Sequence, residues 1–300
     1  MNPFLLHSIV VLGGDRTPRR ALSVTLAISA AFVVACGSGD REDPDVATAG
    51  GALVHVHGLG INPQDGALYI ATHTGLFRVG RGETEPARVG DSTQDTMGFT
   101  VVGPDRFLGS GHPGELDNAI NPLGLIRSTD SGESWTPVSL EGQADFHILR
   151  SSEGLVYGVD SSSGRLLVSG DGGDSWDERP TPGPLIDLVP DPAGGGRLVA
   201  SSDAGLHASG DGGRSWRPRS GAVGLLAWPA RKRLYLVDVQ GGVHLSRDGG
   251  RRWSRRGTIG GQPAALLAHG ADELYAALPD GTVKRSRDGG SAWDVYAGSR

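Results

Sequence analysis

The sequence predicts an all-β fold made of six repeated units with four strands each, and three observations support this prediction. The first is the motif Ser-x-Asp-x-Gly-x-x-Trp, which occurs five times, beginning at Ser128, Ser169, Ser209, Ser246 and Ser286. The second is its spacing, because successive motifs begin 41, 40, 37 and 40 residues apart. The third is glycine, which supplies 49 of the 300 residues. That is more than twice the usual share of about 7% and is typical of a chain with many tight turns.

Short strand-like runs precede each motif. In the last unit, residues 264–268, 273–277 and 282–285 predict three strands ahead of the fourth. The same order occurs at residues 57–61, 68–72 and 75–79, in a first unit whose motif has degenerated to GRGETEP. Six units over residues 51–300 have about 42 residues each, which suits a four-stranded propeller blade. We therefore predict a six-bladed β-propeller over residues 51–300. Its ring closes either with residues 51–54 added to the last blade or with residues 295–296 alone.

The repeated motif has the composition of a tight turn against a hydrophobic core. Its aspartate can accept hydrogen bonds from turn N–H groups, its glycine can adopt a positive φ, and its tryptophan can bury a large apolar surface. We expect these residues to be structural and assign them no catalysis. They are Asp130 and Trp135, Asp171 and Trp176, Asp211 and Trp216, Asp248 and Trp253, and Asp288 and Trp293. Tyrosines recur in the second strands, so we expect core positions for Tyr69, Tyr157, Tyr235 and Tyr275.

These motifs resemble the Asp-box (BNR) repeat family of β-propellers, and the overall pattern is similar to sialidase-like or glycosyl-hydrolase-like lipoproteins. The segments HVHGLG, MGF, GHP and DFH extend the resemblance over nearly all of residues 52–300. The resemblance implies that each box is the turn between the third and fourth strands of a blade. It does not by itself establish an activity.

The first 36 residues have the pattern of a lipoprotein signal. A basic segment containing Arg16, Arg19 and Arg20 precedes an apolar stretch at residues 21–35, which is too short for an ordinary membrane span. The only cysteine, Cys36, follows directly and resembles the lipidated cysteine of a bacterial lipobox. We predict a signal peptide at 1–35, a flexible tether at 36–50 and an extracytoplasmic, membrane-anchored protein. Both Sec and twin-arginine export stay open.

The charge balance bears on the expected partners. The formal net charge is −6, which argues against a nucleic-acid-binding protein. We expect a monomer that meets an envelope protein or a surface glycan.

Five of the nine histidines are predicted to gather at one end of the ring. Starts of first strands and loops between second and third strands share one end of a propeller, and residues i and i+2 of a strand face the same side. This places together His55, His57, His73, His112 and His147, with Asp95, Met97 and Asp145. Imidazole suits Zn or Cu, and a thioether favours copper, so a metal site is one interpretation. The alternative is a polar channel mouth whose histidines form hydrogen bonds or bind an anionic ligand. An insertion at residues 111–123 lies at the same predicted end and offers Glu115, Asp117 and Asn118 to a pocket.

Glycoside hydrolysis is the alternative function. It requires a pair of carboxyl groups, and the candidates at this end are Asp95, Asp145, Asp160, Asp187, Asp203 and Glu115, among which nothing in the sequence selects two. Sialidases also need three arginines and an early Arg-Ile-Pro motif, which is absent here. We therefore expect a binding module with a His-rich mouth, with a sialidase-like hydrolase as the alternative and true sialidase activity disfavoured.

Overall fold

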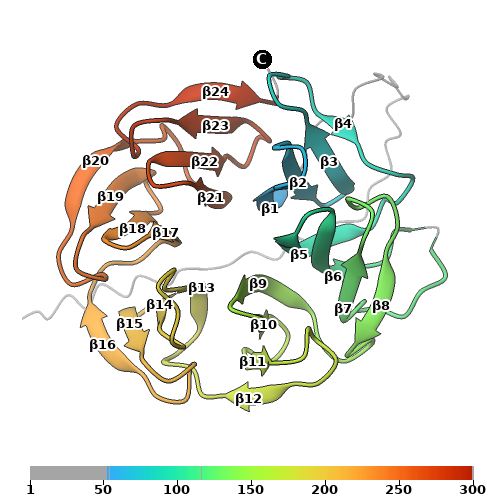
Figure 1. Ribbon diagram of the computed structural model, residues 1–300, viewed down its shortest axis with the longest axis horizontal. Helices are drawn as coiled ribbons and strands as arrows, with labels where there is room; N and C mark the ends of the chain where they lie inside the picture. Colours follow the sequence, from blue (N-terminus) through green and yellow to red (C-terminus); the bar gives the residue numbers. More distant parts are fainter. Residues whose placement is uncertain (1–52, 54, 116, 299–300) are drawn as a thin grey trace, which may run out of the picture. The chain divides into compact units, whose positions relative to one another are not determined.

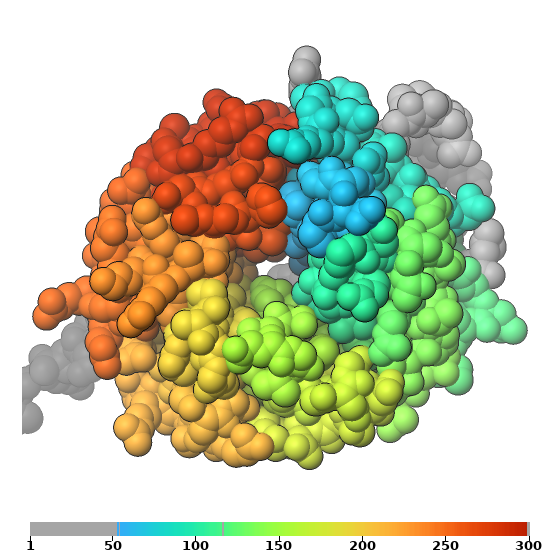
Figure 2. Space-filling view, in the orientation of Figure 1, coloured from blue at the N-terminus to red at the C-terminus, as the bar shows by residue number. Residues whose placement is uncertain are grey.

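The computed structural model describes residues 53, 55–115 and 117–298. Within these residues, 24 strands form six four-stranded antiparallel sheets around a central channel, the blades of a six-bladed β-propeller (Figure 1; Figure 2). The predicted fold class is confirmed. The predicted signal peptide, the tether and Cys36 lie outside the described residues. No helix in the described part of the chain has the length and apolar character that a membrane span requires.

Each blade is a meander of four consecutive strands, with the first strand innermost and the fourth at the rim. Blades 1 and 2 contain β1 Val56–Ile61, β2 Leu68–Thr72, β3 Gly75–Val79, β4 Ala87–Arg88, β5 Asp95–Gly103, β6 Arg106–His112, β7 Leu125–Ser128 and β8 Thr136–Ser139. Blades 3 and 4 contain β9 Phe146–Ser152, β10 Leu155–Asp160, β11 Leu166–Ser169, β12 Asp177–Arg179, β13 Leu185–Pro190, β14 Leu198–Ser202, β15 Gly205–Ser209 and β16 Arg217–Ser220. Blades 5 and 6 contain β17 Leu225–Ala230, β18 Arg233–Val237, β19 Gly242–Ser246, β20 Ser254–Thr258, β21 Ala265–His269, β22 Glu273–Ala277, β23 Val283–Ser286 and β24 Asp294–Ala297.

The five boxes form the turn between the third and fourth strands of blades 2 to 6, and all five use the same hydrogen bonds. In blade 3 the N–H of Ser175 donates to Asp171 Oδ1 at 3.0 Å, and the N–H of Gly173 donates to Ser169 Oγ at 2.8 Å. Gly173 has a φ of 102°, a conformation that a side chain would strain. The predicted turn chemistry is confirmed.

The box tryptophans pack against the seam between their own blade and the preceding one. Trp176, for example, contacts the core cluster of blades 2 and 3, where its ring centroid lies 5.1 Å from that of Phe146. The four second-strand tyrosines are buried as expected, with exposed fractions of 0–4%. Burial of these large rings supplies much of the hydrophobic free energy that holds neighbouring blades together.

The ring closes at the seam of blades 6 and 1. Blade 6 contains β24 from its own sequence, in agreement with the predicted closure at residues 295–296. Of the other predicted segment, residues 51–54, only Leu53 is described, and it packs in this seam. Blade 1 has no box tryptophan, and Phe77, Tyr275 and Tyr296 fill this seam instead.

Candidate metal centre

The inner strands of the first four blades each contain a β-bulge at the same position near their start. The register of β1 against β2 shifts between Val56 and Gly58, and equivalent shifts occur in β5, β9 and β13. The inner strands β17 and β21 pair regularly at their starts. The bulged residues are His57, Met97, His147 and Ile186. Because a bulge re-aims the side chain that it carries, the side chains at the channel mouth are directed differently in blades 1 to 4 than in blades 5 and 6.

Three of the predicted residues from blades 1 and 2 form a first group, which we call triad 1: His57, His73 and Asp95. Each offers one ligand atom, and these atoms lie within 4.8 Å of one another. Nδ1 of His73 lies 2.7 Å from Asp95 Oδ2, and Nε2 of His57 lies 3.3 Å from Asp95 Oδ1. His57 comes from β1, His73 directly follows β2, and Asp95 begins β5. The antiparallel pairing of β1 and β2 thus brings His57 and His73 together, and the contact between β1 and β5 of the next blade adds Asp95.

The contact between His57 and Asp95 is not a hydrogen bond. Nε2 of His57 and Oδ1 of Asp95 are buried and have no hydrogen-bond partner, although 3.3 Å separates them. Two ligands of one tetrahedral zinc ion, with bonds of about 2.0–2.2 Å, lie about 3.3–3.4 Å apart. The separation therefore fits two ligand atoms directed at one shared ion.

The charge state of Asp95 suits a ligand. Burial raises the pKa of this carboxyl. The polar contact and positive charge of His57, together with the charge of His73, lower it by more than burial raises it, so the pKa lies below its usual value. Asp95 is therefore ionised at neutral pH and available to a cation.

A second group, triad 2, consists of His112, Asp145 and His147, whose ligand atoms also lie within 4.8 Å of one another. His147 Nε2 lies 2.9 Å from Asp145 Oδ2, and His112 Nε2 lies 3.6 Å from the same oxygen. Within the described residues these two triads are the only groups of three that offer metal ligands at this spacing.

Two further side chains orient triad 2. Nδ1 of His112 lies 2.7 Å from Oδ1 of Asn121. Because this amide oxygen accepts a hydrogen bond, the proton of a neutral His112 ring lies on Nδ1 and leaves a lone pair on Nε2, facing Asp145. The hydroxyl of Ser161 donates to Asp145 Oδ2 at 2.8 Å. Neither Asn121 nor Ser161 was predicted, although Ser161 occupies the position after the second strand that is histidine in blades 1 and 2.

Asp145 is the most buried member of either triad. Burial raises its pKa, but the hydrogen bonds from His147 and Ser161 and the charges of the two histidines lower it to a value below the usual one. Its second oxygen, Oδ1, is buried without a hydrogen-bond partner. An ionised, half-satisfied carboxylate is costly to bury, and a cation would satisfy it.

The two triads are neighbours. Asp95 of triad 1 is paired directly with His112 of triad 2 across β5 and β6, and the Cβ atoms of such pairs lie about 4.5–5.5 Å apart. The other two predicted ligands lie beside the triads. The His55 ring is 5.9 Å from that of His73, and its backbone has a φ of 49°, uncommon for a residue with a side chain. Met97 is the bulged residue of β5. In the sequence it lies between Asp95 of triad 1 and His112 of triad 2.

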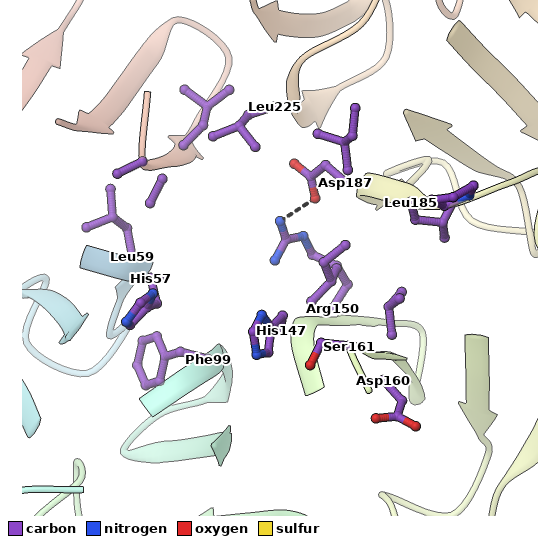
Figure 3. Close-up of a pocket in the computed structure, with 18 of the residues that line it drawn as sticks. His57, Leu59, Phe99, His147, Arg150, Asp160, Ser161, Leu185, Asp187 and Leu225 are labelled. Atoms are coloured by element: carbon purple, nitrogen blue, oxygen red, sulfur yellow. Dashed lines mark hydrogen bonds and ion pairs between the residues drawn. The ribbon is translucent and has the colours of Figure 1, made fainter. Parts of the chain in front are cut away.

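A cavity of about 420 Å³ in the channel adjoins both triads. Figure 3 shows His57 and His147, one from each triad, on its wall, with Phe99 next to His57. Arg150 also lines this cavity and pairs with Asp187 at 2.7 Å. A ligand in the channel can therefore reach both triads.

The other candidate carboxyl groups are occupied or exposed. Asp160 is fully buried and accepts hydrogen bonds from Asp145 N–H and from Ser162 and Ser163; burial raises its pKa but these bonds lower it to about 2. Asp187 accepts from Arg150 and from the N–H groups of Leu188 and Leu226.

The acidic residues outside the channel wall contribute little to the site. Asp203, Glu115, Asp117 and Asn118 are exposed and line neither channel cavity. The insertion contributes to the site through His112 and Asn121 instead.

Comparison with known proteins places the fold. No family model and no curated protein matches the sequence. Among solved structures, a GH74 enzyme from Niastella koreensis matches 82% of this chain at 14% identity with a TM-score of 0.60. The GH74 xyloglucanase from Xanthomonas campestris matches 82% at 20% identity with a TM-score of 0.55. YCF48 from Cyanidioschyzon merolae matches 81% at 18% identity with a TM-score of 0.51, and YCF48 has also been solved bound to D1 peptide.

These likenesses define the class of protein, a β-propeller similar in fold to GH74 enzymes and to YCF48. The chain spans 46% of the length of the two GH74 chains and 85% of the YCF48 chain. At such low identity the match concerns the fold alone.

Proposed function

We propose that this chain is an envelope-anchored binding module of the Asp-box family, whose channel mouth holds one transition-metal ion, zinc or copper, at each of triads 1 and 2. The observation that carries the proposal is the pair of buried atoms, His57 Nε2 and Asp95 Oδ1, which face each other at 3.3 Å without hydrogen-bond partners. Two imidazoles and one carboxylate suit Zn and Cu(II), and three protein ligands leave a coordination position open for an external ligand.

The open positions are the reason to expect binding at this mouth. His57 and His147 both line the channel cavity, so a ligand atom entering from the channel can complete the coordination of either ion. The partner we propose is an envelope protein or a surface glycan, met by a monomer tethered through lipidated Cys36. The structure of YCF48 with a bound peptide supports the idea that a propeller of this fold can serve as a protein-binding platform.

Metal content tests the proposal. The untagged full chain is stripped with a chelator, dialysed against Zn²⁺ or Cu²⁺ and measured by elemental mass spectrometry. We expect the wild type to retain metal at a stoichiometric level, and His57→Ala and His147→Ala each to retain less. His244→Ala is the matched control, because His244 pairs with Asp238 at 2.8 Å but belongs to neither triad. Retention by the wild type that equals that of a His57→Ala/His147→Ala double variant contradicts the proposal.

Glycoside hydrolysis is supported by the fold likeness to GH74 enzymes alone. A general acid must be protonated at working pH, whereas the pKa values of Asp95, Asp145 and Asp160 are all lowered. A panel of glycosides separates the two functions. Turnover that one carboxyl substitution abolishes would rank hydrolysis above binding.

A further inference from the structure

A cavity outside the channel, of about 510 Å³, lies at the seam of blades 4 and 5. Its wall includes Arg219 of β16, Trp228 near the end of β17, and Arg231 and Lys232 of the turn after β17. Residues of the blade 5 box also line it. Ends of inner strands and box turns lie on the face opposite to the starts of inner strands, so this cleft, which we call the seam cleft, is on the other face of the ring from the triads.

Arg219 has two internal counterparts that show what is unusual about it. Arg179, Arg219 and Arg256 each stand three residues after a box tryptophan. Arg256 donates to the carbonyl oxygens of Asp288 and Gly289 and to Ser291 Oγ in the box of the next blade. Arg179 pairs with Asp177 at 2.9 Å. Among the contacts of the described residues, Arg219 has no ion pair and no hydrogen bond. Its Nε is buried without a hydrogen-bond partner, as is Nε of Arg179.

The box that Arg219 faces also differs from the one that Arg256 faces. The position of Ser291 in the blade 6 box is occupied by Arg251 in blade 5, so a cation stands where Arg256 finds a hydroxyl. Burial lowers the pKa of the Arg219 guanidinium and the neighbouring charge of Arg251 lowers it too, while the charge of Asp248 opposes them only in part. Two cations facing each other are unfavourable unless an anion lies between them.

A second unsatisfied donor lines the same cleft. Nε1 of Trp228 is buried without a hydrogen-bond partner, and its indole lines the cavity with Arg219. A buried N–H of this kind usually finds an acceptor. Arg219 and Trp228 thus line one cavity, and each has a donor that no protein acceptor satisfies.

The charges around the cleft are also unbalanced. Arg231, Lys232 and Arg247 line it and are exposed, and in the described structure none of them has an acidic group within 4 Å. Of the two aspartates in the wall, Asp191 pairs with Arg197 at 2.8 Å. Asp248 accepts from the N–H groups of Arg251 and Arg252 in its own turn. The cleft thus presents an excess of positive charge on an otherwise acidic chain.

We propose that the seam cleft binds the phosphate group of a phosphate monoester through Arg219 and the Trp228 N–H, with Arg231, Lys232 and Arg247 at its rim. A guanidinium fork matches phosphate geometry, and a dianion suits several unpaired cations. The volume is within the range of small-molecule sites, which is large enough for a sugar phosphate. The phosphate can come from a soluble sugar or from a lipid headgroup.

Titration with three probes tests this site in the full chain carrying Cys36→Ser, so that no lipid anchor contributes. Inorganic phosphate and glucose 6-phosphate are titrated by calorimetry, and vesicles of phosphatidic acid in phosphatidylcholine are compared with phosphatidylcholine alone by co-sedimentation. We expect saturable binding that weakens with added salt. Arg219→Gln should weaken it about ten- to a hundredfold, the value of one or two charge-assisted hydrogen bonds.

Two variants keep the test specific. Arg217→Gln, an exposed change on the same strand outside the cleft, should leave affinity unchanged, and Trp228→Phe, which retains an aromatic ring but loses the N–H, should weaken it. Thermal melting confirms that each variant folds. Binding of the soluble probes or only of phosphatidic acid supports the site and identifies the source of the phosphate. The proposal is overturned if the wild type binds no probe more strongly than Arg219→Gln does. It is also overturned if Arg217→Gln weakens binding as much as Arg219→Gln.

Discussion

Blades 1–3 and blades 4–6 are built from the same four-stranded meander, yet their inner strands begin with different chemistry. The first half of the ring has His57, Asp95 and Asp145 at or next to these starts, whereas β13, β17 and β21 begin with Leu185, Leu225 and Ala265. The cations gather in the other half and on the other face, where the seam cleft lies. One scaffold therefore carries two chemically distinct surfaces.

This difference teaches that the repeated box and the site are separable. The box hydrogen bonds are the same in blade 2, which contributes to both triads, and in blade 6, which contributes to neither. Because the box turn and the seam tryptophan hold blades 2 to 6, the strand starts are free to vary without loss of the fold.

The largest effect we expect is on the packing beneath triad 2. Phe146 lies between Asp145 and His147 in sequence, is fully buried, and packs so closely on Gly158 that an added Cβ there would lie 2.5 Å from its ring. Phe146→Ala should lower the free energy of unfolding by about 3–5 kcal/mol, measured by urea denaturation.

Leu185 occupies the equivalent position in blade 4 and serves as the control. It is only half-buried, so Leu185→Ala should cost clearly less. An equal loss of unfolding free energy in the two variants would mean that the two halves of the ring depend equally on this position and do not differ there.

The sequence was sufficient for the scaffold because its signals are local and repeated. Asp171, Gly173 and Trp176 meet their partners within one turn or one seam. Five copies of the box and one degenerate first unit together predicted six blades. The gathering of the histidines at one end also followed from strand order. Their roles as metal ligands stay a prediction, which the metal titration tests.

The detailed arrangement of the candidate site depended on contacts that a single sequence does not reveal. The division into two triads follows from bulges at His57 and His147, which change register by one residue and leave no mark in the hydrophobic pattern. Asn121 reaches His112 from an irregular insertion. Arg219 could have been noticed in the sequence. It stands three residues after a box tryptophan, and the next box has Arg251 at the position of Ser291.

A smaller change should distinguish one triad from the other. Ser161 donates to Asp145 but touches no residue of triad 1, and loss of such a supporting hydrogen bond typically lowers metal affinity about 10–100-fold. In a His57→Ala background, which leaves triad 2 alone, Ser161→Ala should weaken Zn²⁺ binding in a chelator competition. In a His147→Ala background it should have no effect. The same loss in both backgrounds would show that the triads act as one site.

The smallest effect concerns the box shared by both halves. The hydroxyl of Ser215, then that of Ser209 and the N–H of Ser215, lower the pKa of Asp211 to about 2. Since this folded-state pKa lies below the unfolded value of about 3.9, the carboxylate stabilises the fold fully above about pH 4, and that contribution is lost as the pH falls toward 2. Melting temperatures between pH 5 and pH 2 should therefore fall less steeply for Asp211→Asn than for the wild type. Asp174→Asn, an exposed change in a neighbouring box, should leave the wild-type slope. If Asp211→Asn keeps that slope as well, the acid sensitivity lies outside the boxes, and the scaffold of the two halves is less uniform than their hydrogen bonds indicate.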